Sequence, residues 1–232
     1  SGSGGLTVSG GTETLSGANT YTGVTTVASG AGLSLPGSVA GALTTAGTTD
    51  VNGGTVAGTT TNTGTLTAEG GTLAAVANNG GTATLSDTTA GAVTNASGAT
   101  FSATGGTLAS AANSGTMTLG AGNTVSGDVT QTAGSLTLDG NTVDGTVAAN
   151  GGTFDVASAG STAGSLSGTA SGTLDGTLDL TKASSTYSGG MSGSGGLTVS
   201  GGTETLSGAN TYTGDTIVAS GASLTVSNGG QL

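Results

Sequence analysis

Residues 100–119 read TFSATGGTLASAANSGTMTL, and this stretch spans one repeat of a pattern that recurs along the chain. A Thr-apolar pair opens the stretch at Thr100-Phe101, and a second pair, Thr116-Met117, begins its last four residues. Successive side chains of a strand alternate between two faces, so Met117 and Leu119 share one face. Gly105-Gly106 tolerates the positive φ of a tight turn. The stretch therefore predicts short strands joined by glycine turns.

The Thr-apolar pair recurs along the chain at a nearly constant step, because the sequence numbers of successive pairs differ by 17, 18, 16, 19, 18 and 20. The pairs, in which Ser replaces Thr once, are Thr65-Leu66, Thr82-Ala83, Thr100-Phe101, Thr116-Met117, Ser135-Leu136, Thr153-Phe154 and Thr173-Leu174. Two further apolar columns follow in each step, with turn residues such as Asn78-Asn79-Gly80 between strands. These columns are Leu73, Leu108, Val125 and Val143, and then Val76, Val93, Val129, Val147 and Leu166. Since one such coil cannot bury its apolar face alone, we expect the coils to stack into a rod.

The composition agrees with an all-β fold. The 232 residues include 50 Gly and 1 Pro, and 33% are hydrophobic, which fits neither collagen nor a flexible Gly/Ser linker. Thr, Val and Gly favour strands and tight turns over helices. We predict an all-β fold, a single-stranded parallel β-helix (β-solenoid) with about 18 residues per coil. A β-sandwich is the weaker alternative, because its loops vary in length.

The charge balance excludes several classes of partner. The net charge is −11, and Lys182 is the only basic residue. A chain with one cation cannot neutralise a phosphate backbone or an anionic bilayer, so we expect no nucleic-acid partner and no membrane insertion of this segment. No signal peptide is recognisable at residues 1–10, which suggests that a leader was removed or that the segment is internal.

The two ends of the chain carry the same sequence. Residues 1–23 match residues 192–214 one for one, so the numbering of the two copies differs by 192 − 1 = 191. Over residues 1–35 and 192–226, 30 of 35 aligned positions are identical. We therefore expect one continuous β-solenoid over residues 1–232, in which residues 36–191 form the coils between the two copies.

These copies resemble the passenger-associated β-strand repeat of bacterial autotransporters and large β-helical adhesins. The resemblance rests on residues 5–8 (GLTV), 15–23 (LSGANTYTG) and 25–30 (TTVASG), and its second copy spans residues 196–221. The repeat-motif residues are Leu15, Gly17, Asn19, Tyr21 and Gly23, and then Leu206, Gly208, Asn210, Tyr212 and Gly214. The resemblance implies a right-handed parallel β-helix that is exported through a Gram-negative envelope and is secreted or held at the bacterial cell surface.

The leading functional expectation is a structural and adhesive extracellular rod. Both termini carry ordinary coil sequence where a solenoid normally needs a cap, because an open end exposes unpaired strand edges. We therefore expect the ends to stack on further copies into a stalk, a biofilm matrix or a filament. Surface polysaccharide and other cells are further candidate partners.

Two alternatives rest on particular residues. Asp175 and Asp179 form the best carboxylate pair for a polysaccharide-binding or polysaccharide-processing β-helix, with only Lys182 near them. Outward Thr pairs such as Thr65/Thr67 suggest ice binding, although Ser102 interrupts the series. We expect no enzyme activity, no catalytic residue, no cofactor and no metal.

The remaining polar candidates have structural interpretations. We expect Glu13 and Glu204 on a solvated outward face. Asp128, Asp139, Asp144 and Asp155 are spaced singly, which is typical of a solubilising surface, with weak calcium binding between coils as the alternative. For Asn19-Thr20-Tyr21 and its copy Asn210-Thr211-Tyr212 we expect Asn to cap a turn and Tyr to pack over the coil, with a recognition patch as the alternative.

Overall fold

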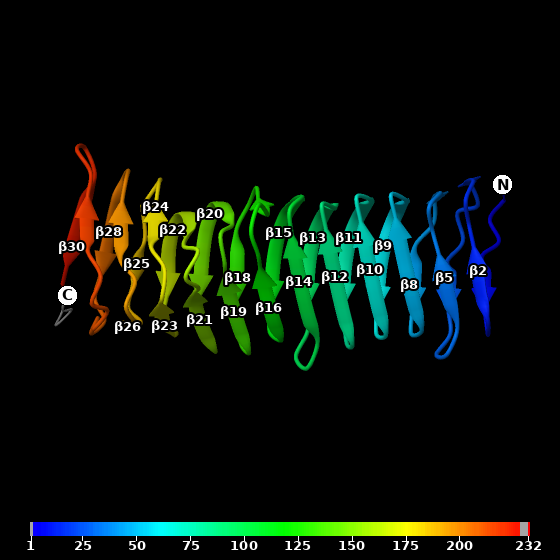
Figure 1. The fold of residues 1–232 in the computed structure, drawn as a ribbon, viewed down its shortest axis with the longest axis horizontal. Helices are drawn as coiled ribbons and strands as arrows, with labels where there is room; N and C mark the ends of the chain where they lie inside the picture. The colour runs from blue at the N-terminus through cyan, green and yellow to red at the C-terminus, as the bar shows by residue number, and fades with distance from the viewer. Residues whose placement is uncertain (1, 228–231) are drawn as a thin grey trace.

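The computed structural model describes residues 2–227 and residue 232, and it is an all-β parallel β-solenoid of about 12 turns (Figure 1). The chain advances coil by coil from one end of the rod to the other, so the two termini lie at opposite ends. The described residues contain no helix, and hence none that could cross a membrane. The coil length of about 18 residues is confirmed.

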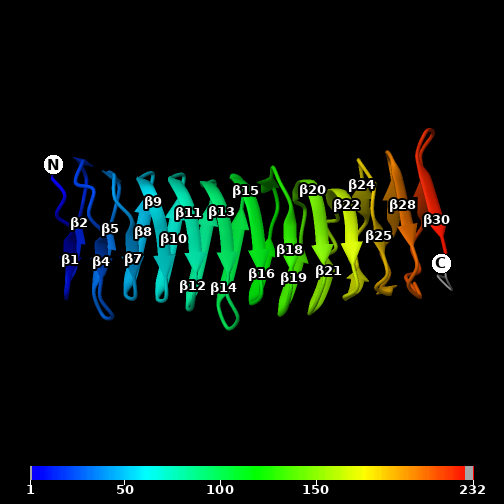
Figure 2. The ribbon, with the colours of Figure 1, turned by 180° about the vertical axis from the view of Figure 1, so that it is seen from behind.

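All strand pairings within the described residues are parallel and fall into two sheets, seen from both sides in Figures 1 and 2. The 11-stranded sheet contains β2 (Thr12–Thr14), β5 (Gly32–Ser34), β8 (Thr48–Asn52), β10 (Thr65–Glu69), β12 (Thr82–Ser86), β14 (Thr100–Thr104), β16 (Thr116–Leu119), β19 (Ser135–Leu138), β21 (Thr153–Val156), β23 (Ser171–Leu174) and β26 (Met191–Ser192). The 19-stranded sheet contains β1 (Leu6–Val8), β3 (Ala18–Asn19), β4 (Thr25–Val27), β6 (Ser38–Val39), β7 (Leu43–Thr45), β9 (Thr55–Asn62), β11 (Thr72–Asn78), β13 (Thr89–Asn95), β15 (Thr107–Asn113), β17 (Thr124–Val125), β18 (Val129–Gln131), β20 (Thr142–Ala149), β22 (Ser161–Gly168), β24 (Leu178–Leu180), β25 (Thr186–Tyr187), β27 (Leu197–Val199), β28 (Thr203–Leu206), β29 (Thr216–Val218) and β30 (Ser223–Val226).

Each coil has three faces. Face 1 carries β3, β6, β17, β24, β27 and β29, whereas face 2 carries β1, β4, β7, β18, β25, β28 and β30. Long strands such as β11 and β13 run across both of these faces. Face 3 is the 11-stranded sheet. On every face the inward side chains are mostly apolar, and one continuous column of them fills the rod.

Two of the three predicted columns are confirmed, those that end at Val143 and at Leu166. The column of Thr-apolar pairs is confirmed up to Phe154, and its last step, to Leu174, is wrong. Thr153 pairs with Ser171, and Phe154 pairs with Gly172. Thr173-Leu174 instead pairs with the next two residues of β21. A Cβ on Gly172 would lie 3.0 Å from the Phe154 ring and 3.1 Å from the Tyr187 hydroxyl, so a glycine fits beside these two aromatic rings where other coils hold an apolar side chain.

Asn78, which the sequence placed in a turn, instead points into the rod together with three other Asn side chains. Asn62, Asn78, Asn95 and Asn113 are at most 2% exposed, and each donates from Nδ2 to the side-chain oxygen of its successor, ending on Gln131. The four distances are 2.7, 2.8, 2.8 and 2.5 Å. Each Nδ2 also donates to a backbone carbonyl, for example Asn95 to Thr116 at 2.9 Å. This amide ladder satisfies polar groups that would otherwise be costly to bury.

The two repeat copies keep the same internal pairing but lie on different faces. Glu13 pairs with Leu33 in the 11-stranded sheet, whereas Glu204 pairs with the equivalent Leu224 in the 19-stranded sheet. The same local sequence therefore occupies two different positions around the rod.

The displacement of the second copy can be followed along one column of stacked residues. Residues that pair with one another in successive coils form a stack that starts at Val8 and reaches Leu206 in β28 after 11 coils. The sequence equivalent of Val8 is instead Val199, which ends the preceding strand β27. The second copy thus begins one strand short of 11 full coils, and it is displaced by one face.

Candidate functional site

The repeat-motif residues lie close to the two ends of the rod, in the first two and last two coils. In the first copy the Asn19 Nδ2 donates to the carbonyls of Gly17 (2.9 Å) and Ser38 (3.1 Å). The Tyr21 hydroxyl lies 2.7 Å from the Thr25 Oγ1. These contacts tie the Asn side chain to its own turn and to the following coil, which is a structural arrangement.

The second copy makes matching contacts from a more enclosed position. The Asn210 Nδ2 donates to the Gly208 carbonyl at 3.0 Å, and its Oδ1 accepts from the backbone amide of Met191 at 3.1 Å. The Tyr212 hydroxyl lies 2.6 Å from the Thr216 Oγ1. Tyr212 is 7% exposed, whereas Tyr21 is half-buried. The preceding coil supplies the added cover.

The motif glycines show how closely successive coils approach. A Cβ on Gly23 would lie 2.5 Å from the carbonyl carbon of Gly4, and a Cβ on Gly214 would lie 2.5 Å from the carbonyl carbon of Gly195. A Cβ on Gly208 would overlap the carbonyl of Gly189, whereas one on Gly17 would meet nothing within 4 Å. Since Gly17 and Gly208 are equivalent in sequence, the difference comes from the coil that lies before Gly208. Leu15 and Leu206 differ in the same way, because Leu15 is half-buried and Leu206 is fully buried.

The apolar residues of the last coil are exposed where their first-copy equivalents are covered. Val27 and Leu35 are fully buried, whereas their equivalents Val218 and Val226 are 44% and 39% exposed. Ile217 beside them is 51% exposed. Within the described residues no strand pairs with the far side of β29 or β30, so this C-terminal edge offers both apolar side chains and free backbone groups.

Glu204 does not lie on a solvated face as expected; it is buried with no exposed surface. Glu204 and Leu206 are the inward-facing residues of strand β28, and neighbouring coils cover this strand on both sides. The Ser165 hydroxyl donates to Oε2 at 3.0 Å, while the buried Oε1 has no hydrogen-bond partner among the described residues. Glu13, in contrast, is exposed, but it is in register with the buried Leu33, so its exposure comes from its place in the first coil and not from an outward face.

Burial governs the protonation of Glu204. It raises the pKa of this carboxyl to about 7, although hydrogen bonds from Ser165 and from the backbone of Leu166 and Ser185 act to lower it. The cause is the loss of hydration of the charged form. A buried carboxyl of this kind is therefore largely neutral in mildly acidic solution.

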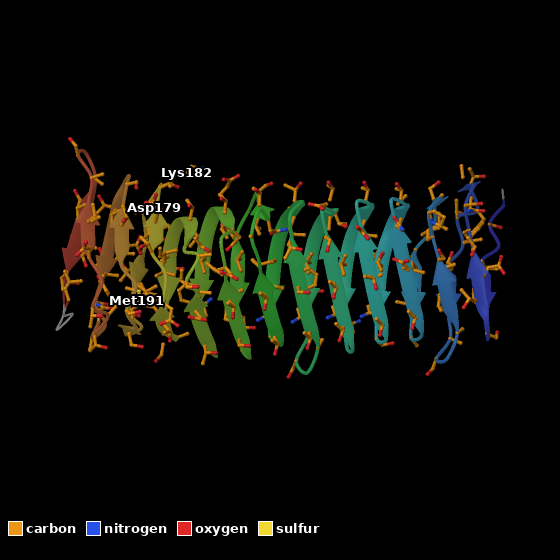
Figure 3. The ribbon with its side chains drawn as sticks, in the orientation of Figure 1. Asp179, Lys182 and Met191 are labelled. Carbon is orange, nitrogen blue, oxygen red and sulfur yellow. The ribbon has the colours of Figure 1, made fainter. Side chains whose placement is uncertain are left out.

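The carboxylate pair proposed for polysaccharide chemistry is not brought together in one groove. Asp179 lines a surface hollow with Asn141 and Ser161, whereas Asp175 lines a separate hollow with Asp215. The Asp179 carboxylate accepts a hydrogen bond from the Ser200 hydroxyl. Figure 3 shows Asp179 and Lys182 in the C-terminal part of the rod, where the Lys182 Nζ lies 3.4 Å from the Asp144 carbonyl.

The other aspartates lie at or near the rod surface. Asp155 is half-buried, and burial followed by the charges of Asp175 and Asp139 raises its pKa. The Asp128 Oδ1 accepts a hydrogen bond from the backbone amide of Thr146 at 2.8 Å. Among the described residues no group of three or more His, Cys, Asp or Glu side chains is arranged to hold a metal ion.

Two hydroxyl columns run along the outer side of face 3. Thr65, Thr82, Thr100 and Thr116 form the first column in register. Ser102 lies between Thr84 and Thr118 in the second column, so the substitution of Thr by Ser does not interrupt the hydroxyl series. The regular coil spacing thus produces a repeating hydroxyl surface over several coils.

Comparisons with protein families, with curated proteins and with solved structures give no match to this chain.

Proposed function

We propose that this chain is a structural and adhesive segment of an extracellular bacterial rod, and that its ends join further copies of the same chain. The observation that carries the proposal is the exposure of Val218 and Val226 at positions where Val27 and Leu35 are fully buried. A coil added beyond β30 would cover these side chains and pair the free strand backbone. Burial of apolar surface and completion of the ladder both favour such an addition.

The repeat itself supports the extracellular assignment. Residues 5–8, 15–23 and 25–30 carry the resemblance to autotransporter passengers and large adhesins, and such passengers are displayed or released at the bacterial surface. The acidic, cysteine-free composition is compatible with such a location. Polysaccharide or cell-surface partners would then bind along the sides of the rod, while the ends serve assembly.

Sedimentation velocity and negative-stain electron microscopy of the 232-residue chain test the joining. Wild-type protein should form rods longer than one chain in a concentration-dependent manner. Val218→Lys places a charge at an inward position of the open edge and should leave single rods. Ile217→Thr restores the residue that the first copy has at an outward position, and it should join like wild type. Single rods of wild-type protein at all concentrations would refute the proposal.

A second candidate function, ice binding, is favoured by the two in-register hydroxyl columns of face 3. Their spacing is fixed by the strand separation of about 4.8 Å, which makes the surface regular over several coils. Thermal hysteresis at millimolar protein would decide this candidate. The matched pair is Thr84→Lys, which interrupts the hydroxyl surface, and Thr94→Lys on face 2, which does not.

A further inference from the structure

We propose that end-to-end joining takes up a proton at Glu13, so that the joint is strong in mildly acidic solution and weakens as the pH rises. The inference rests on the proposed joining of ends, and its partner is a second copy of this chain. Its basis is one sequence seen in two surroundings. Residues 1–23 and 192–214 are identical, yet Glu204 is fully buried while Glu13 is exposed.

The difference follows from the neighbouring coils. Glu204 has Ser185 of the preceding coil on one side and Leu224 of the following coil on the other. Glu13 has Leu33 of the following coil on one side, and the described residues place no coil on the other. The joining partner would supply that missing coil. Leu6 and Leu15 are also only half-buried at this end, whereas their equivalents Leu197 and Leu206 are fully buried.

The buried carboxyl has no cation to stabilise its charge. The two strands that flank Glu204 are β25, which carries the buried Tyr187, and β30, which carries no titratable residue. Strand β22, which supplies Ser165, carries none either, and Lys182 is exposed. The contacts of Glu204 are instead the Ser165 hydroxyl and backbone groups, and the Ser165 Oγ itself accepts the Ser184 amide at 3.0 Å. An uncompensated carboxylate in such a place favours its neutral form.

The same holds at the Glu13 end. Strand β5 beside Glu13 carries no titratable group, and the next strand, β8, carries Asp50. The last coil of a joining partner would contribute Tyr212 and Asp215, neither of which is a cation. Covering Glu13 therefore removes water from a carboxylate and supplies no basic side chain in return.

The direction of the pH effect follows from linkage. A carboxyl that is ionised while exposed and neutral once covered binds one proton as it is covered, so the joining constant of such an end falls by up to about tenfold for each pH unit. The fall ends where the carboxyl ionises in the joined state. At Glu204, the identical residue of the second copy, burial raises the pKa to about 7.

The experiment is sedimentation velocity of the purified 232-residue chain at pH 5 and pH 8, each at low and high salt. The test variant is Glu13→Gln, because the neutral Gln amide can be buried without any change of protonation. The matched control is Glu69→Gln, which removes the same charge from an exposed position in the middle of the rod. Wild type and Glu69→Gln should join at pH 5 and separate by pH 8, whereas Glu13→Gln should join at both.

High salt separates this effect from general repulsion between acidic rods, because salt screens exposed charges and leaves the buried position largely unaffected. The pH dependence of wild type should therefore persist at high salt. Equal pH dependence in wild type and Glu13→Gln would overturn the inference while leaving end-to-end joining intact. Single rods under every condition, in wild type and in Glu13→Gln, would overturn the proposed joining itself.

Discussion

Asn95 donates a hydrogen bond from its Nδ2 to the Oδ1 of Asn113, 2.8 Å away in the next coil, and both side chains are buried. Asn95 also accepts from Asn78 on its other side, so each amide is held by the coils before and after it. Identical side chains can form such a ladder only when the coils are in register. The interior of the rod is therefore fixed by directional contacts as well as by apolar packing.

We predict that Asn95→Leu destabilises the rod by at least about 2 kcal/mol, because it leaves the amide of Asn78 and the oxygen of Asn113 each short of a buried partner. The check is a shift of the urea unfolding midpoint. Asn79→Ala is the control, since Asn79 is exposed and next to a ladder residue; its effect should stay within about 0.5 kcal/mol. Similar losses in both variants would mean that the ladder adds nothing to stability.

Close approach of neighbouring coils gives a second prediction. A Cβ on Gly91 would overlap the backbone carbonyl of Ala74 in the preceding coil, whereas a Cβ on Gly10 would meet nothing within 4 Å. Gly91→Ala should therefore lower the melting temperature clearly, and Gly10→Ala should leave it nearly unchanged. Circular dichroism on heating measures both. An unchanged melting temperature for Gly91→Ala would show that the coils can separate locally at little cost.

The third prediction concerns the pH dependence of stability. The folded pKa of Glu204, about 7, lies above its ordinary value of 4.5, so the folded state binds the proton more tightly than the unfolded state. The stability that this proton contributes is complete below about pH 4.5 and is lost as the pH rises through 7. Glu204→Gln should weaken this decline in stability between pH 5 and pH 8.

Urea unfolding at several pH values measures this effect, with Glu69→Gln as the charge-matched control. Asp155, whose pKa is also raised by burial, contributes in the same direction and should leave a smaller residual slope in Glu204→Gln. A slope unchanged by Glu204→Gln would contradict the assignment of the proton to Glu204.

The strands and the coil length could be predicted from the sequence because inward apolar side chains repeat with the coils. Gly172 escaped the pattern, since its place in the column is set by two aromatic neighbours that a linear sequence does not bring together. Asn95 was not recognised as an interior residue, because Asn is equally typical of a turn. Its recurrence at the steps of Asn78 and Asn113 was the available signal.

The burial of Glu204 could not be read from composition, because an acidic residue is normally solvated. The identical surroundings in sequence of Glu13 and Glu204 also suggested equivalent positions. Their faces differ because position around the rod depends on the summed length of all intervening coils. These coils vary in length, as the successive pairings of Thr12 with Gly32 and of Gly32 with Thr48 show. The identical sequence of the two copies therefore specifies how strands pair within each copy. The face of the rod on which each copy lies is set by the length of the chain between them.

The displacement of the second copy by one face has a consequence for any series of units that repeats with the offset between the two copies. Each unit would be turned by roughly a third of a revolution relative to the one before it, because each coil has three faces. The hydroxyl columns of face 3 would then follow a helical path around the stalk and return to the same side with every third unit. A surface ligand approaching from any direction would meet them, and no side of the stalk would be left without them.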